Sequence, residues 1–225
     1  MKNLFFILSI FICVHFAFFF ISPQCGHAEE SSETIFSDSY QLNGFAAEYE
    51  TEPKDILLAM IQDDTISAYK MAAAVRVFKK KFSPDVVLRE KRIIEKILLR
   101  RLSRTDSPFV QVEIMHTLCR IDRYKYFPTM VPSLILKLDH YNSTVNELSY
   151  KALEDTFETE NPKAREARIV FNTLRKVLFL SRKRLANVTE PDIRLQQKLK
   201  LIRWSIKVLG TQELERLPQE VMSLL

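Results

Sequence analysis

Glycine is scarce in this sequence: among 225 residues it occurs only at Gly26, Gly44 and Gly210. Phosphate-binding loops, dinucleotide-binding crevices and most β-rich folds depend on glycine-rich turns. The composition therefore argues against a nucleotide-binding enzyme of the usual kinds. At the same time, 47% of the residues are hydrophobic and 27% are charged, which is the composition of a folded domain with a real core.

Cysteine and histidine are also few, with three and four residues respectively. Cys13 and Cys25 belong to the N-terminal segment described next, so Cys119 is left alone in the body of the protein. No HExxH, CxxC or DxDxDG pattern is present. This excludes a disulfide scaffold and a zinc module, and we expect neither a cofactor nor a metal.

Residues 1–28 have the layout of a secretory signal peptide. Lys2 precedes the apolar run 4–21, which is followed by Pro23 and by small residues at Gly26 and Ala28. We expect cleavage after Ala28. The run is close to the ~20 residues needed to span a bilayer, so an uncleaved membrane anchor is the alternative. In both versions the body is extracytoplasmic: periplasmic or secreted after cleavage, anchored to the inner membrane otherwise.

Charge is distributed unevenly along the rest of the chain. Residues 29–55 contain eight Asp and Glu against Lys54 alone, whereas residues 56–225 contain 31 Lys and Arg against 20 Asp and Glu. The serine-rich, acidic segment 29–52 lacks a clear apolar period, which is typical of a flexible leader. We therefore expect the folded domain to cover residues 53–225.

From residue 53 onward the signals are helical. Ser83-Pro84, Ser107-Pro108 and Asn161-Pro162 each place proline after a capping residue, as at a helix start. The apolar residues that follow recur with a period of 3.6, and Gly210 is placed to end a helix with a left-handed residue. We expect no strands and nine helices, at about 53–63, 65–82, 84–103, 107–121, 127–139, 143–159, 162–186, 190–209 and 211–224.

These helices pair off into similar units. The segments 56–64, 97–102 and 134–139 are each apolar, reach an Asp-containing turn and precede a second helix. The second helices begin near residues 65, 107, 143 and 190, at offsets of 42, 36 and 47. This spacing resembles HEAT and armadillo repeats, whose period is about 40–47 residues. The resemblance implies an all-α fold, an α-solenoid of about four helical hairpins, with segment 214–222 as a C-terminal capping helix.

Stacked hairpins expose a long binding surface rather than a closed active site. The leading hypothesis is therefore an exported, noncatalytic scaffold or adaptor protein of the cell envelope. A membrane-anchored structural subunit of an envelope complex is one alternative. Another is an envelope enzyme accessory that uses Cys119 with His116, one turn apart on one helix; a buried Cys119 would count against it.

Basic clusters are the main surface feature, and we expect them to recruit a protein partner of acidic character, or an anionic envelope lipid or polymer. The competing interpretation is that these cations are only solvated side chains on the flanks of helices and bind no partner. Nucleic acid is not expected, because the protein is exported and Phe78, Phe171 and Phe179 fall at core positions. The sequence does not specify an oligomeric state. The expected partner-binding residues are Arg100, Arg101, Arg104, Arg182, Lys183, Arg184, Lys200, Arg203 and Trp204.

Overall fold

Short polar side chains begin five of the helices in the computed structural model, which describes residues 37–159, 161–186, 188 and 190–225. The side-chain oxygen of each accepts a hydrogen bond from a backbone N–H of the first helical turn, where no intrahelical acceptor exists. The five capping residues are Ser37, Ser67, Asp122, Asn142 and Asp192.

The described residues form α-helices and short 3-10 helices and contain no strand, so the all-α prediction is confirmed. The α-helices are α2 (Asp38–Glu48), α3 (Lys54–Gln62), α4 (Ala68–Phe82), α5 (Leu88–Arg104), α6 (Pro108–Ile121), α7 (Arg123–Leu136), α8 (Ser143–Phe157), α9 (Ala164–Leu185), α10 (Ile193–Leu209) and α11 (Gln219–Met222). The 3-10 helices are Tyr49–Thr51, Ser83–Asp85, Lys137–Asp139 and Thr211–Arg216.

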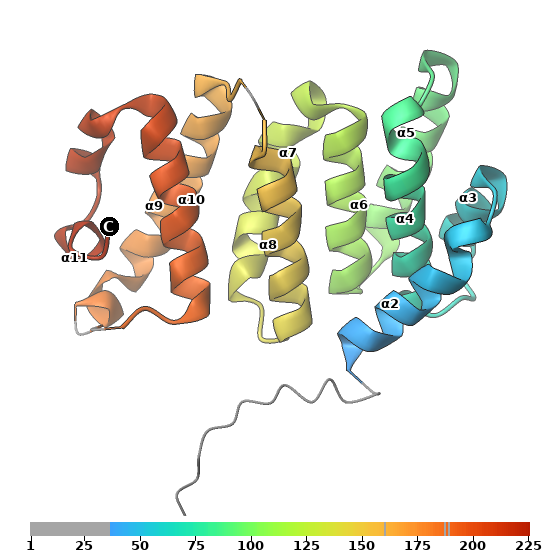
Figure 1. Ribbon diagram of the computed structural model, residues 1–225, viewed down its shortest axis with the longest axis horizontal. Helices are drawn as coiled ribbons and strands as arrows, with labels where there is room; N and C mark the ends of the chain where they lie inside the picture. The colour runs from blue at the N-terminus through green and yellow to red at the C-terminus, as the bar shows by residue number, and fades with distance from the viewer. Residues whose placement is uncertain (1–36, 160, 187, 189) are drawn as a thin grey trace, which may run out of the picture. The chain divides into compact units, whose positions relative to one another are not determined.

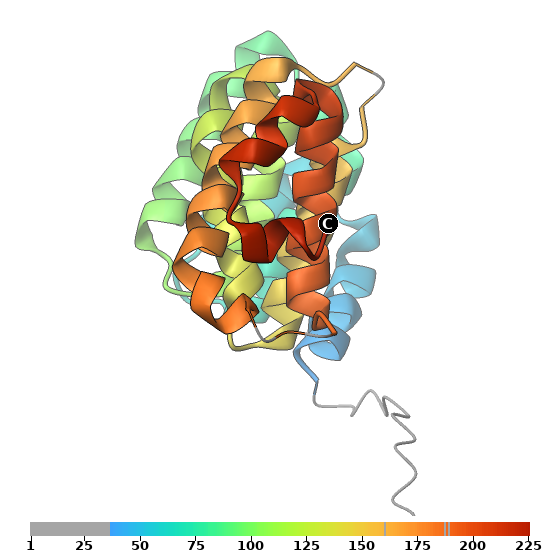
Figure 2. The same cartoon turned by 90° about the vertical axis from the view of Figure 1, so that its left-hand side faces the viewer.

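Consecutive helices from α3 onward pack as four antiparallel pairs, α3 with α4, α5 with α6, α7 with α8 and α9 with α10. The pairs lie side by side in chain order (Figure 1). The first helices α3, α5, α7 and α9 form what we call the first layer. The helices α4, α6, α8 and α10 form the second layer, which α2 extends by packing on α4. Figure 2 looks along the row and shows the two layers next to each other.

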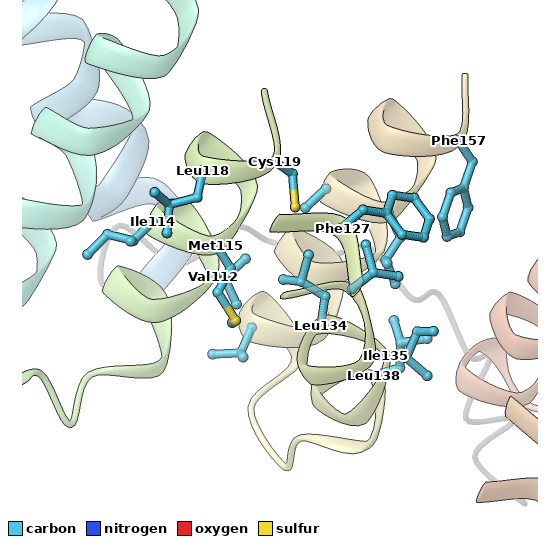
Figure 3. Packing of buried hydrophobic residues seen from close by; sticks show 14 of the residues in the cluster. Val112, Ile114, Met115, Leu118, Cys119, Phe127, Leu134, Ile135, Leu138 and Phe157 are labelled. Atoms are coloured by element: carbon cyan, nitrogen blue, oxygen red, sulfur yellow. The ribbon is translucent and has the colours of Figure 1, made fainter. Parts of the chain in front are cut away.

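The core lies between the layers and is centred on α6, which contacts α4, α5, α7 and α8. Every residue of α6 from Val112 to Cys119 is buried. Figure 3 shows Cys119 on the side of this helix that faces Phe127 of α7, and Ile114 and Leu118 on the opposite side. Because residues 112–119 of α6 are buried on all sides, the polar residues among them must find partners inside the protein.

The helices expected between residues 53 and 209 are present with shifted ends; Asn161-Pro162, for example, precedes α9, which begins at Ala164. The single helix expected at 211–224, with its capping segment 214–222, is instead a 3-10 helix and the four-residue α11, separated at Leu217 and Pro218 because proline lacks the N–H that a continuous helix needs. Ser107-Pro108 begins α6 as expected. Ser83-Pro84 instead forms a 3-10 turn, and α5 begins four residues later, at Leu88. Gly210 ends α10 with φ of 107°, in the region that favours glycine, although its ψ of 157° is not that of a left-handed helix.

The expected flexible leader differs from the structure over residues 38–51. These residues form α2 and the following 3-10 turn, and Leu42 is fully buried against the core. Ser37 caps this helix: its side chain accepts a hydrogen bond from the Tyr40 N–H at 3.1 Å. The folded domain thus begins before residue 53. The signal peptide expected at 1–28 and the rest of the leader, 29–36, lie outside the described residues, and no described helix is long and apolar enough to cross a membrane.

Candidate anion-binding site

Four cationic residues form a row along α5. Arg92, Lys96, Arg100 and Arg104 are spaced by four residues, which places them on successive turns of one helix face, and all four are exposed. Like charges at this spacing destabilise a helix by roughly 0.2–0.5 kcal/mol per pair. The row contains three such pairs in succession. The repulsion among these four cations therefore lowers the stability of the folded protein.

The row borders a groove of about 690 Å³ between α5 and the C-terminal end of α3, which we call the α3–α5 groove. Its apolar lining consists of Ile61 from α3 with Ile93 and Ile97 from α5. Ile93 is 63% exposed and adds apolar surface beside the cations. The remaining lining residues are Gln62, Asp64, Arg92, Lys96, Arg100, Arg101 and Arg104.

Arg101 fixes the geometry of the α3–α5 groove rather than facing solvent. Its side chain is buried; Nε donates to the Ile61 carbonyl at 2.7 Å and Nη1 to Asp64 Oδ1 at 2.6 Å. The Ile61 carbonyl lies in the last turn of α3, where main-chain acceptors lack intrahelical donors. Of the expected binding residues, Arg101 thus joins two helices, while Arg100 and Arg104 border the open groove.

The electrostatic balance of the α3–α5 groove is positive. Asp64 is its one acidic lining residue, and Arg101 and Arg104 both pair with it, the latter at 3.8 Å. Among the ion pairs of the described residues, none includes Arg92, Lys96 or Arg100. These three cations remain available to an anionic ligand.

The other expected clusters lie elsewhere. Arg182, Lys183 and Arg184 are in the last turn of α9, a helix that does not contact α5. The structure therefore does not gather all the expected residues into one site. It separates them into the α3–α5 groove and a second basic region at the end of α9.

The three expected residues of α10 are engaged within the protein. Lys200 pairs with Glu154 of α8 at 2.7 Å. Trp204 stacks on Phe157 at a centroid distance of 4.4 Å, and Arg203 donates to the main-chain oxygens of the last two residues, at 3.1 Å from Nη2. Together these contacts hold α10 against α8 and the C-terminus.

Cys119 and His116 do not form a reactive pair. Cys119 is 4% exposed, and burial raises the pKa of its thiol to about 12, which disfavours the nucleophilic thiolate. Both ring nitrogens of His116 are engaged, Nδ1 with Lys79 at 2.9 Å and Nε2 with Asp155 at 2.6 Å. No ring nitrogen is left to take a proton from a thiol.

A closed charge network surrounds His116 and joins α4, α6 and α8 of the second layer. Buried Glu113 accepts from Arg76 Nε at 2.8 Å and from Lys79 Nζ at 2.7 Å. Burial alone would raise the pKa of Glu113, but the charges of Lys79 and Arg76 outweigh it and lower the pKa to about 2. Burial also lowers the pKa of His116. This network connects helices and leaves no free acid or base.

Two residues of the α3–α5 groove, Arg92 and Lys96, were not among the expected binding residues. Their signal is present in the sequence: counting back from Arg104 in steps of four gives Arg100, Lys96 and Arg92. The four-residue spacing is easily missed when cations are grouped by adjacency in sequence, because adjacent residues point to different faces of a helix. The described residues contain no group of three or more His, Cys, Asp or Glu that could hold a metal ion.

The fold and the α3–α5 groove define an all-helical protein with an open, cationic, partly apolar surface site. Comparisons with models of protein families, with characterised proteins and with solved structures find no match to this chain.

Proposed function

We propose that the protein is an exported, noncatalytic interaction protein that binds an extended acidic segment of a partner protein in the α3–α5 groove. The observation that carries this proposal is the row of cations on α5. Three like-charge pairs at i,i+4 cost stability, and none of the ion pairs of the described residues includes Arg92, Lys96 or Arg100. A charged surface that lowers the stability of the fold is expected to be retained because it binds a partner.

The spacing of the row favours an extended segment. Residues four apart on a helix lie about 6 Å apart along its axis. Alternate side chains of an extended chain point to the same side and repeat at about 7 Å. A segment with acidic residues at alternate positions can therefore set successive carboxylates against Arg92, Lys96 and Arg100. Ile93 and Ile97 would receive apolar side chains beside them.

The scaffold we propose is a HEAT-like α-solenoid of four hairpins with a C-terminal cap. Its support is the two-layer packing of α3 to α10 together with the repeat spacing of the sequence. In such a stack α5 is held firmly, because it packs on α3 and α6 and forms ion pairs with Asp122 and Lys125 at the start of α7. A rigid row of cations loses little conformational entropy on binding.

The test uses the full chain and a fluorescent oligo-glutamate peptide as the probe. We expect binding that weakens steeply with salt, since its attraction is electrostatic. The double variant Arg92→Glu with Arg100→Glu should lose at least tenfold in affinity. The matched control, Lys151→Glu with Lys207→Glu, changes the net charge equally at exposed positions of α8 and α10. Equal losses in both variants would show that only the net charge of the protein matters.

Export has its own test. N-terminal sequencing of the exported protein should begin at Glu29, because Gly26 and Ala28 provide the small residues that signal peptidase accepts. Retention of residues 1–21 in a washed membrane fraction would favour the membrane-anchored structural subunit instead.

A further inference from the structure

Two large apolar side chains protrude together near the end of α9. Phe179 is 50% exposed and Leu180 is 84% exposed, contrary to the core position expected for Phe179. The inward face of α9 is formed by Leu174, Leu178 and Leu185, all buried. Because Phe179 and Leu180 follow Leu178 directly, helical geometry turns them away from that face.

Cations flank this apolar pair on both sides. Lys176 lies one turn before it and Lys183 and Arg184 lie one turn after it, and all three are exposed. The Arg182 guanidinium lies over the Phe179 ring at 4.1 Å and holds the ring in place. The outward face of α9 from Lys176 to Arg184, which we call the stripe, thus carries cations on both sides of the apolar pair.

Acidic charge is nearly absent from this region. The α9 helix contains seven Lys and Arg and one acid, Glu166, at its other end. Glu166 is buried and bound to Arg123 at 2.8 Å, so it does not offset the basic stripe. A hollow of about 640 Å³ separates Phe179 and Leu180 from residues 215–218, where Glu215 is the one acidic residue.

We propose that this stripe of α9 docks on the surface of an anionic lipid bilayer. A helix face with exposed apolar side chains between lysines and arginines lies in the membrane interface, with the apolar groups below the level of the headgroups and the cations among them. A protruding apolar pair suits this deformable surface, whereas a protein partner would need a matching pocket. This inference goes beyond the proposed function and involves a different helix.

The expected loss of membrane affinity follows from the number of cations that are removed. Each cation near an anionic surface contributes roughly fivefold in affinity at low salt. Removing Lys183 and Arg184 should therefore weaken docking at least tenfold. Phosphatidylcholine alone, which lacks net charge, should not support docking at all.

The experiment places a reporter in the stripe of the full chain. Leu180→Trp adds a fluorophore to a protein whose single tryptophan, Trp204, is packed against Phe157. Vesicles of phosphatidylcholine and phosphatidylglycerol with brominated acyl chains quench tryptophan that enters the interface. We expect a blue shift and quenching of the added emission, both absent with phosphatidylcholine alone and after Lys183→Glu with Arg184→Glu.

The matched control is Ile193→Trp, at a 71% exposed position of α10 in the second layer. This local readout is needed because residues 4–21 would themselves bind vesicles whether or not α9 does. Quenching at 180 but not at 193 supports docking. Quenching at both positions, or at neither, overturns it, and a response of Leu180→Trp to the oligo-glutamate peptide alone would assign the stripe to an acidic protein. None of these outcomes depends on Arg92 or Arg100, so the proposed function is tested separately.

Discussion

Both layers of the protein connect neighbouring helices through ion pairs, and they differ in how many cations remain outside those pairs. In the second layer, Glu113, Asp155 and Glu154 each bind a cation or histidine from the neighbouring helix, which connects α4 to α6, α6 to α8 and α8 to α10. In the first layer, α5 and α9 each carry seven Lys and Arg. The only acids on α5, α7 and α9 are Glu90, Glu95 and Glu166, and each is already paired.

Exposed apolar residues follow the same division. Of the thirteen large hydrophobic side chains that are exposed in the described residues, eight belong to α5, α7 and α9 or to Val87, which caps α5. Only Tyr40 and Ile193 belong to second-layer helices. The difference indicates that the first layer, besides the ion pairs that connect its own helices, keeps additional cations and apolar groups available for partners.

The largest expected effect is in the second layer. Glu113→Ala should lower the free energy of unfolding by about 3 kcal/mol, because it leaves the partly buried charges of Lys79 and Arg76 without their acid. Urea unfolding measures this loss. Arg100→Ala in the first layer should stay within about 0.5 kcal/mol of the parent. Similar losses in both variants would remove the distinction between the layers.

A smaller loss is expected for the aromatic contact between α8 and α10. Trp204→Ala removes the stack on Phe157 and should cost about 2 kcal/mol in unfolding free energy, since Trp204 is only partly buried. Leu180→Ala is the first-layer control: its side chain is 84% exposed, and we expect almost no change. A large loss for Leu180→Ala would mean that another part of the chain covers α9.

Lowering the pH should lower the free energy of unfolding because of His116 in the second layer. Burial lowers the pKa of folded His116, so the unfolded chain takes up the proton first, at its ordinary pKa of about 6.5. Stability is therefore complete above that pH and falls as the pH drops below it, by at most about 1.4 kcal/mol per pH unit. Lys79, Arg120, Glu113 and Asp155 face the ring, and the two acids titrate in a lower window because their pKa values are lowered.

His116→Gln provides the check, because glutamine keeps hydrogen bonding without a charge in this range. Unfolding followed by circular dichroism between about pH 5 and 7 should lose its slope in this variant. An unchanged slope would assign the titration to another group.

The smallest effect has the opposite sign. Lys96→Gln removes two like-charge pairs, with Arg92 and with Arg100, and should raise the unfolding free energy by a few tenths of a kcal/mol. Urea unfolding at low salt is the measurement, since salt screens the repulsion. A loss of stability would show that Lys96 has a partner in the fold and that the row is not kept for binding.

Much of the helical architecture could be predicted from the sequence, because caps and a 3.6-residue apolar period act locally. Residues 38–51 could not, since the burial of Leu42 depends on contact with α4 rather than on any local period. The prediction for Phe179 was wrong for the same reason: its spacing is that of a core residue, but the described segment that faces it, residues 215–218, lies across a hollow and leaves its side chain half exposed. Local patterns specify a helix, whereas its neighbours decide which face is buried.

The candidate site was predictable only in part. Adjacent cations such as Arg100 and Arg101 look alike in sequence, yet one borders the α3–α5 groove and the other binds the end of α3. Lys200 and Trp204 were expected at a binding surface and instead join α10 to α8. Each of the two paired cations finds its acid far along the chain: Arg101 and Asp64 are 37 residues apart, and Lys200 and Glu154 are 46 residues apart. The amino-acid composition does not reveal such long-range pairs.

The division between the layers is tested most directly by zero-length crosslinking of the oligo-glutamate probe to the full chain. A carbodiimide joins lysine amines to carboxylates that touch them, and mass spectrometry identifies the lysine. We predict that the probe attaches at Lys96, in the α3–α5 groove, and that Lys80, Lys151 and Lys207 of the second layer remain free of it at low salt. Attachment mainly at these second-layer lysines, with Lys96 unmodified, would contradict the account.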